Sequence, residues 1–125
     1  MQTPSIVGVW QVKIKVEGMH EGVDGLYTFF ADGNFLDINS LKETNPGVWR
    51  GSGNSYEVTF WGFGADEKGQ YNAIGKVRAA IQLDNTNHLT AHGVTDVFDP
   101  EGKPIDHQFN GPFKFTGTRI AVEPL

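Results

Sequence analysis

The chain of 125 residues contains no cysteine. This absence excludes disulfide bonds, thiolate metal sites and thiol nucleophiles, so any chemistry must use oxygen or nitrogen groups. No stretch approaches the roughly 18 consecutive apolar residues of a membrane-spanning helix. The first five residues also lack the basic and apolar segments of a signal peptide. We therefore expect a cytoplasmic protein that does not interact with membranes.

Positive charge is scarce as well. The sequence has 10 Lys and Arg against 15 Asp and Glu, which gives a formal net charge of -5. Such a chain offers no general attraction for phosphate backbones, so we do not expect nucleic acid as a partner.

Metal ligation is not expected either, because only His88 and His92 among the four histidines are spaced like ligands, and a strand does not present that spacing as a helix does. The sequence also lacks a serine nucleophile elbow and a phosphate loop, and we expect no cofactor.

What the chain has in abundance is glycine and aromatic side chains, with 16 Gly, 9 Phe, 3 Tyr and 3 Trp. Apolar residues alternate with polar ones along short runs separated by turn residues, and no run carries the 3.6-residue period of an amphipathic helix. The length suits one domain over residues 1–125. We expect strands at roughly 6–17, 25–31, 34–41, 47–52, 55–63, 71–83, 88–98, 104–109 and 112–121.

The turn at Asp32-Gly33 sets the register of one hairpin, because a tight turn decides which side chains share a face. Taken as a two-residue loop, it places Phe30 opposite Phe35 on the outer face, together with Thr28 and Asp37. The more apolar face of this hairpin then carries Tyr27, Phe29, Leu36 and Ile38. We expect this second face to be buried.

The turn at Gly53-Asn54 requires positive φ and places Arg50 opposite Glu57. The alternate positions carry Trp49, Tyr56, Val58 and Phe60. An oppositely charged pair on one face and large apolar groups on the other indicate which side is buried.

A third turn, Asp99-Pro100-Glu101-Gly102, has the pattern of a type I turn followed by a left-handed glycine. It pairs Val97 with Ile105 and Thr95 with His107. In this register the imidazole of His107 points inward.

The remaining strands sort into inner and outer sides by parity alone. The expected inner sets are Trp10, Val12, Ile14 and Val16; Ala73, Gly75, Val77, Ala79, Ile81 and Leu83; Leu89, Ala91, Gly93, Thr95 and Val97; and Phe113, Phe115, Gly117 and Arg119. Sequential antiparallel strands with no helices to cover them are best satisfied by closure, which removes the open edges. We therefore predict an all-β fold, a closed antiparallel up-and-down barrel of about eight strands, with small residues opposite large ones leaving a cavity for one ligand.

Gly8-Val9-Trp10 near the start and Arg119 near the end resemble the signature of the calycin superfamily, which includes lipocalins, fatty-acid-binding proteins and avidins. Residues 117–120 and 27–33 are also similar to bacterial lipocalin-like proteins. The resemblance implies that Trp10 packs beneath Arg119 at the barrel floor, and we expect this structural role for the pair. It extends to allene oxide cyclases and spirotetronate Diels-Alder cyclases, which form rings inside a barrel without a cofactor, although no catalytic motif of theirs maps onto this chain.

The inward aromatic residues form the expected ligand wall, since rigid aromatic rings stack on flat molecules. The candidate ligand-binding residues are Trp49, Phe29, Phe60, Thr95, Phe113 and Phe115. The candidate catalytic residues are His107, Tyr56 and Tyr27, which could exchange a proton or polarise a carbonyl group. Ordinary core packing is the alternative role for all of them.

Three functions remain open at this stage. The first is binding of one small hydrophobic or aromatic molecule inside the barrel. The second is a cofactor-independent cyclase or isomerase acting on a substrate confined in the same cavity. The third is a structural or interaction domain with a filled core. Four aromatic residues assigned to the outer surface suggest self-association as a homodimer: Phe30, Phe35, Trp61 and Phe63.

Overall fold

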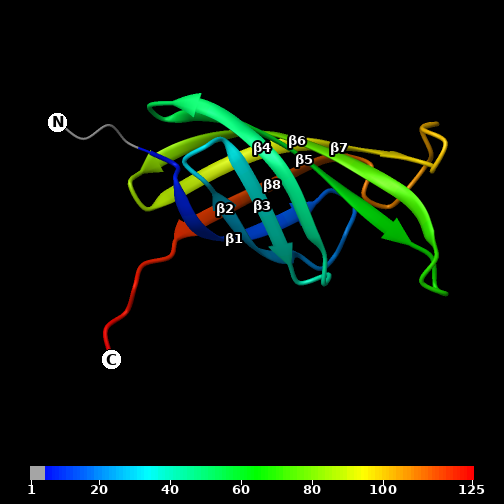
Figure 1. The fold of residues 1–125 in the computed structure, drawn as a ribbon, viewed down its shortest axis with the longest axis horizontal. Helices are drawn as coiled ribbons and strands as arrows, with labels where there is room; N and C mark the ends of the chain where they lie inside the picture. The colour runs from blue at the N-terminus through cyan, green and yellow to red at the C-terminus, as the bar shows by residue number, and fades with distance from the viewer. Residues whose placement is uncertain (1–4) are drawn as a thin grey trace.

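Eight antiparallel strands close into a barrel in the computed structural model, which describes residues 5–125 (Figure 1). The strands are β1 (Gly8–Val16), β2 (Val23–Phe29), β3 (Asn34–Asn39), β4 (Thr44–Ser52), β5 (Ser55–Ala65), β6 (Tyr71–Asn85), β7 (His88–Phe98) and β8 (Gly111–Arg119). Each strand pairs with its neighbours in sequence, and β1 pairs with β8 to close the sheet. The predicted fold class is confirmed. Residues 1–4, on which most of the expectation about a signal peptide rests, lie outside the described residues.

The alternation of apolar and polar residues decides which side of each strand faces the barrel interior. On β1, Trp10 and Val12 are fully buried, whereas Lys13 between the inward positions is exposed. The inner positions predicted for β6, β7 and β8 are all buried or partly buried in the structure. No element among the described residues is a helix, so none there could cross a membrane as one.

The β2–β3 turn differs from the prediction by one residue. Ala31, Asp32 and Gly33 form a three-residue loop in which Gly33 has φ 92° and the Phe30 N–H donates to the Asn34 carbonyl at 3.0 Å. The expected two-residue loop was therefore wrong, and a one-residue change in register exchanges the two faces of a strand.

The exchange moves β3 side chains across the sheet. Phe35 pairs with Phe29 and is 2% exposed, and Asp37 pairs with Tyr27 and is also 2% exposed. The predictions that Phe35 and Asp37 face solvent are corrected. Leu36 and Ile38 alternate with these buried residues and lie on the outer side instead.

The β4–β5 hairpin agrees with the prediction. Gly53 has φ 61°, and Arg50 lies opposite Glu57 with an ion pair at 3.0 Å on the outer surface. The alternate positions of this hairpin, including Tyr56, face the interior.

The segment between β7 and β8 follows the prediction only at its start. Gly102 has φ 89° and its N–H donates to the Asp99 carbonyl at 2.9 Å, and the Ile105 N–H donates to the Val97 carbonyl at 3.0 Å. Beyond this point the chain leaves the sheet, so the strand predicted at 104–109 is wrong. Pro104 still forms an isolated antiparallel bridge with Phe98, so the chain departs only after Ile105.

The side chain of Asn110 replaces the missing ladder. Its Oδ1 accepts from the Val97 N–H at 2.9 Å, and its Nδ2 donates to the Ile105 carbonyl at 2.6 Å. The chain then re-enters the sheet at Gly111, opposite Thr95. His107 is consequently exposed rather than inward, and its Nδ1 accepts from the Phe109 N–H at 3.2 Å.

One end of the barrel is closed by the pair that the sequence singles out. The Arg119 guanidinium lies 4.4 Å from the centre of the Trp10 ring. Its nitrogens donate to the carbonyl oxygens of Ser5 at 2.6 Å, Val7 at 2.7 Å and Thr86 at 2.9 Å. The stack predicted for Trp10 and Arg119 is confirmed, and it fastens the chain before β1 and the β6–β7 turn to the barrel floor.

Replacing Arg119 with alanine should lower the free energy of unfolding by about 3 kcal/mol, because a cation-π contact and three charge-assisted hydrogen bonds are lost together. Arg119→Lys should retain only part of the stability, since an ammonium cannot reproduce the fork of donors. Urea unfolding measures both changes. The control is Lys114→Ala on the outer side of β8, which should leave stability unchanged, and equal stability of the two alanine variants would contradict the assignment.

Candidate functional site

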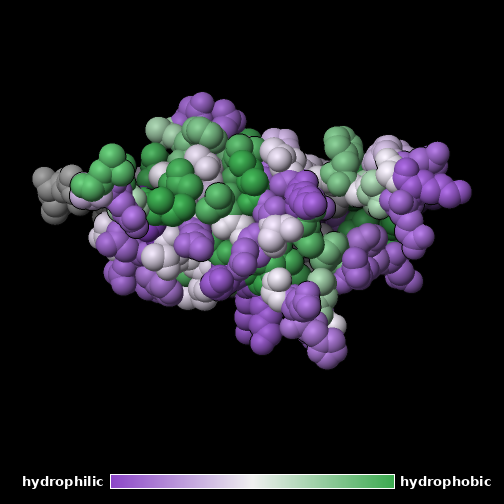
Figure 2. All heavy atoms as spheres, turned by 90° about the horizontal axis from the view of Figure 1, so that it is seen from below, coloured by the Kyte–Doolittle hydropathy of each residue, from purple (hydrophilic) through white to green (hydrophobic). Residues whose placement is uncertain are grey.

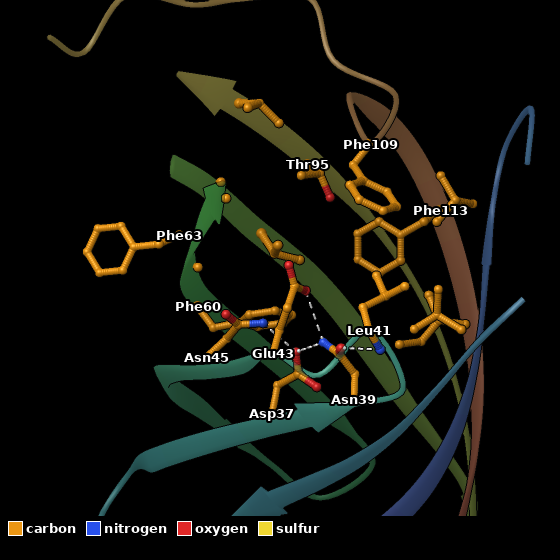
Figure 3. A pocket seen from close by; sticks show the side chains of 18 of the residues that line it. Asp37, Asn39, Leu41, Glu43, Asn45, Phe60, Phe63, Thr95, Phe109 and Phe113 are labelled. Atoms are coloured by element: carbon orange, nitrogen blue, oxygen red, sulfur yellow. Dashed lines mark hydrogen bonds between the residues drawn. The ribbon is translucent and has the colours of Figure 1, made fainter. Parts of the chain in front are cut away.

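A cavity of about 130 Å³ opens at the end of the barrel opposite Arg119 (Figure 3). It is bordered by the last residues of β1, β3, β5 and β7 and the first residues of the strands that follow them. The expected hollow is therefore present at this open end.

The cavity exists because one part of the inner wall carries almost no side chains. A Cβ atom added to Gly75 would have no neighbour closer than 3.9 Å. The nearest atoms belong to Gly62, at 3.9 Å, and Thr95, at 4.0 Å. Further toward the closed end, a Cβ at Gly93 would come within 2.6 Å of the Phe113 ring, so Phe113 already fills the space there. Small residues produce a hollow only where no aromatic ring faces them.

A carboxylate, Asp37, lines this cavity from β3. Its Oδ2 accepts hydrogen bonds from Asn45 Nδ2 at 2.8 Å and from Asn39 Nδ2 at 3.0 Å. Its Oδ1 is buried and has no hydrogen-bond partner among the described residues. Because buried polar atoms nearly always find a partner, this oxygen is the most unusual atom of the barrel interior.

Local geometry holds the two amides that fix Asp37 (Figure 3). A Cβ at Gly62 would overlap the Asn45 amide, so this β5 position must be glycine for Asn45 to lie where it does. Asn39 accepts the Leu41 N–H at 3.0 Å and donates to Glu43 Oε1 at 3.3 Å. The carboxylate is therefore held through one oxygen, and the other is buried beside Gly25 with no hydrogen-bond partner among the described residues.

Burial dominates the electrostatics of the site. It raises the pKa of Asp37 to about 6, with hydrogen bonds from Asn45 and Asn39 acting in the opposite direction and the charge of Glu43 adding to the rise. Burial, followed by the charge of Asp37, raises the pKa of the Tyr27 phenol well above its usual 10. At neutral pH the cavity thus presents a carboxylate beside a neutral phenol.

The charge in the cavity has one sign. Asp37 and Glu43 both line it, and no lysine, arginine or histidine is among the described residues that do so. An anionic ligand would meet two carboxylates and no compensating cation, whereas a neutral or cationic ligand would not be repelled.

Four of the residues predicted from sequence do line the cavity: Tyr27, Phe60, Thr95 and Phe113. Tyr27 packs edge to face against Phe60 with 5.9 Å between ring centres. These residues come from four different strands, so the barrel brings together side chains that are distant in sequence.

The other predicted residues lie elsewhere. Phe29 and Trp49 contact each other with 6.2 Å between ring centres and do not line this cavity, nor does Phe115. The Tyr56 hydroxyl donates to the Gly53 carbonyl at 2.8 Å, in the hairpin at the closed end. With His107 exposed, the three candidate catalytic residues do not come together in one site.

Sequence reasoning missed the polar cluster of Asp37, Asn39, Glu43 and Asn45. The signal was present in the Ala31-Asp32-Gly33 run, since a three-residue loop with glycine in the left-handed position is a common hairpin connection. That choice would have turned Asp37 inward, opposite Tyr27.

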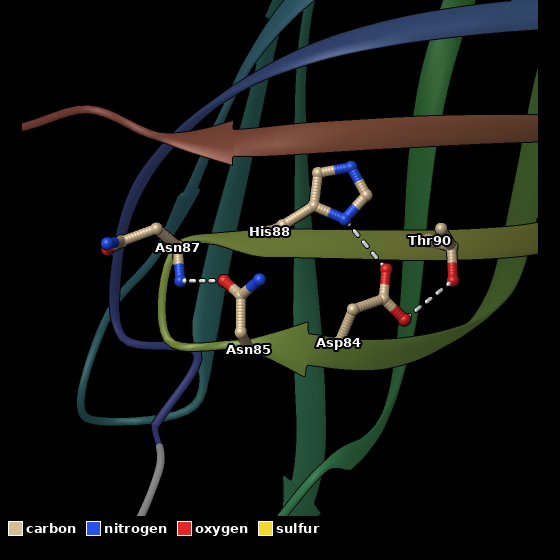
Figure 4. A network of polar contacts seen from close by, with 5 residues as sticks. All are labelled: Asp84, Asn85, Asn87, His88 and Thr90. Atoms are coloured by element: carbon tan, nitrogen blue, oxygen red, sulfur yellow. Dashed lines mark hydrogen bonds and ion pairs between the residues drawn. The ribbon is translucent and has the colours of Figure 1, made fainter.

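His88 and His92 lie on the outer side of β7. His88 Nδ1 lies 2.7 Å from Asp84 Oδ2 on the outer surface (Figure 4), and Thr90 Oγ1 lies 3.5 Å from the other oxygen of Asp84. His92 is exposed. Within residues 5–125, no group of three or more histidine, aspartate or glutamate side chains is arranged to hold a metal ion.

Three of the four aromatic residues assigned to the outer surface are exposed, and one of them, Phe63, also borders the cavity. Phe30 is 45% exposed, Trp61 42% and Phe63 72%, as predicted, whereas Phe35 is buried and leaves the expected dimer surface. Apolar and polar side chains are interspersed on the face shown in Figure 2. Self-association remains a prediction.

Taken together, the open end of the barrel combines apolar walls with a carboxylate, one oxygen of which is buried and has no partner among the described residues. Such an oxygen can accept a hydrogen bond or a proton from a bound molecule. In comparisons with protein-family models, curated proteins and solved structures, nothing matches this chain.

Proposed function

We propose that the barrel binds one small, flat, mainly apolar molecule in the open-end cavity, and that this ligand carries a hydrogen-bond donor that contacts Asp37 Oδ1. The observation that carries the proposal is the buried, unpartnered oxygen. Leaving such an atom without a partner destabilises a protein by roughly 1–3 kcal/mol. A donor on the ligand would remove that penalty, so the new hydrogen bond would increase the affinity for the ligand.

The dimensions of the cavity support a compact ligand. Its volume of about 130 Å³ is close to that of apolar protein cavities that take up a single benzene ring. Because the cavity opens to solvent, a second ring or a short substituent could extend outward. The rings of Phe60 and Phe113 offer flat faces and edges for such a molecule.

The charge of the site narrows the ligand further. A fatty acid or other carboxylate would face Asp37 and Glu43, so we propose a neutral or cationic ligand. The eight-stranded barrel and the Trp10–Arg119 stack support a lipocalin-like binding protein, the first function considered from the sequence. A ligand without a carboxylate would set it apart from a carrier of fatty acids.

A pair of matched probes tests this proposal. Indole and 1-methylindole have nearly the same shape, but only indole has an N–H donor. We expect wild-type protein at pH 7.5 to bind indole about tenfold more tightly than 1-methylindole, as measured by calorimetry or by amide NMR shifts of cavity residues. The donor preference should disappear in Asp37→Asn, whose amide group directs an N–H toward the cavity because its carbonyl accepts from Asn39 and Asn45.

The control variant is Glu57→Gln, which removes a carboxylate from the outer surface and should retain the full preference for indole. Equal affinities of the two probes for wild-type protein would refute the role of Asp37. Failure of both probes to bind would instead favour the third function, a structural domain whose interior takes up no ligand.

A further inference from the structure

We propose that Asp37 is a catalytic general base, which takes a proton from a carbon atom of the molecule bound in the cavity and so makes the barrel a cofactor-independent isomerase or lyase. This inference rests on the proposed function, because the substrate must first occupy the same cavity. It assigns the catalytic role to a residue that the sequence interpretation placed on the outer surface.

The hydrogen bonds of Asp37 fix its carboxyl group and leave one oxygen available as a proton acceptor once a substrate reaches it. Two amide N–H groups fix one oxygen at 2.8 and 3.0 Å, and the second oxygen stays free of protein donors within the described residues. A base held in this manner loses little freedom when it meets a C–H group, which is the main advantage of positioning in catalysis. The supports are themselves constrained, since Gly62 leaves room for Asn45 and the Leu41 N–H holds Asn39.

The surroundings of Asp37 favour a strong base. The facing side chains of β1, β5 and β8 that line the cavity include Ile14, Phe60 and Phe113, none of which titrates. The titratable groups nearby are Tyr27 from β2 and Glu43, which precedes β4. A carboxylate with a pKa of about 6 is ionised at neutral pH and still a better proton acceptor than an ordinary aspartate.

Tyr27 complements the base. It lines the same cavity from the strand next to Asp37, and its raised pKa keeps it in the protonated form. A neutral phenol can donate to an oxygen atom on which negative charge develops. The pair therefore supplies a proton acceptor and an oxyanion donor on adjacent strands.

The chemistry suits a flat, apolar ketone with a double bond one carbon beyond its acidic C–H group. Asp37 Oδ1 takes the proton from the carbon next to the carbonyl, the C–H electron pair forms a new C=C bond, and the carbonyl π pair moves to oxygen. The resulting dienolate accepts the proton back from Asp37 at its far carbon, and the carbonyl re-forms. The double bond has moved by one position, with no change in oxidation state and no other reactant.

The test uses 5-nitrobenzisoxazole, a flat apolar molecule that reports on buried carboxylate bases. A base takes its C3 proton, the C–H electron pair becomes the third bond of a nitrile, and the N–O bond breaks to release 2-cyano-4-nitrophenolate, which absorbs visible light. We expect saturable conversion by wild-type protein with a rate that rises with pH through about 6 and then levels off. Asp37→Asn should reduce kcat/KM at least 100-fold, within the usual contribution of a general base.

Two controls keep the result interpretable. Glu57→Gln should convert the probe at the wild-type rate, and Asp37→Asn should still bind 1-methylindole, which shows that its fold and cavity are intact. Probe that binds without being converted, or conversion that is equal in Asp37→Asn, would overturn the catalytic role while leaving indole binding and the proposed function in place. Probe and indole that both fail to bind would overturn the two proposals together.

Discussion

Asp37→Asn should make the protein more stable at pH 8 by about 3 kcal/mol, because the ionised carboxylate is the least favourable group in the barrel interior. The fold holds the pKa of this buried side chain at about 6 rather than its usual 3.8. A difference of this size between folded and unfolded chains corresponds to roughly 3 kcal/mol at a pH above both values. Asparagine keeps a similar shape and carries no charge to bury.

The pH dependence of the effect has a definite sign. The folded state binds the proton more tightly than the unfolded chain, so this carboxyl lowers stability as pH rises from about 4 to about 6. Below about pH 3.5 both states are mostly protonated, and the advantage of Asp37→Asn should be almost lost. Urea unfolding of both proteins from pH 3.5 to pH 8 measures the difference.

Glu57→Gln on the exposed face provides the reference, since it should show no comparable pH-dependent gain. A difference between wild type and Asp37→Asn that stays constant with pH, or a loss of stability at pH 8, would contradict the burial of an ionised group. Asp37→Asn should therefore gain stability and lose the preference for indole. This combination is typical of a residue that is kept for function at a cost in stability.

Gly75→Leu should abolish binding of indole, with affinity reduced more than 100-fold, and should leave the fold intact. Gly75 lies near the middle of the small wall, where an added Cβ meets no atom closer than 3.9 Å. A leucine side chain would extend into the space that we assign to the ligand. Because it fills a cavity and replaces glycine within a strand, the free energy of unfolding should stay the same or rise by about 1 kcal/mol.

The matched control for this change is Ala80→Leu, which places the same leucine side chain on the outer side of the same strand. It should leave indole affinity unchanged. Retention of wild-type affinity by Gly75→Leu, measured by calorimetry, would show that the ligand binds elsewhere.

Parity along the strands made much of the fold predictable. The alternation in β1, β6, β7 and β8 identified the buried face of each strand, and Trp10 with Arg119 identified the closed end. The β4–β5 register followed from one turn at Gly53-Asn54. These features depend on local sequence, in which a period of two and a turn of known length carry the information.

The candidate site was harder to predict because it depends on the number of residues in the β2–β3 loop and on how deep each side chain lies along the barrel axis. Adding one residue to the β2–β3 loop moves Asp37 from solvent to the interior. Parity also gives no position along the barrel axis, which depends on the tilt and stagger of the strands. Trp49 and Tyr56 therefore face inward as predicted but do not line the cavity, whereas Phe113 does.

The loss of the strand at 104–109 has a different cause. The alternation around His107 was compatible with a strand, but the Asn110 side chain bonds to both Val97 and Ile105 and takes over the donor and acceptor that a strand would use. Competition of this kind between a side chain and the backbone is settled by tertiary structure. The position of His107 could not be read from the pattern.

The proposed function and the catalytic role both depend on contact between Asp37 Oδ1 and a molecule bound in the open-end cavity. A crystal structure of the protein with indole at pH 7.5 tests it most directly. We expect the indole ring between Phe113 and the wall around Gly75, with its nitrogen within hydrogen-bond distance of Asp37 Oδ1. An empty cavity at saturating indole, or a ring whose nitrogen points away from Asp37, would contradict it.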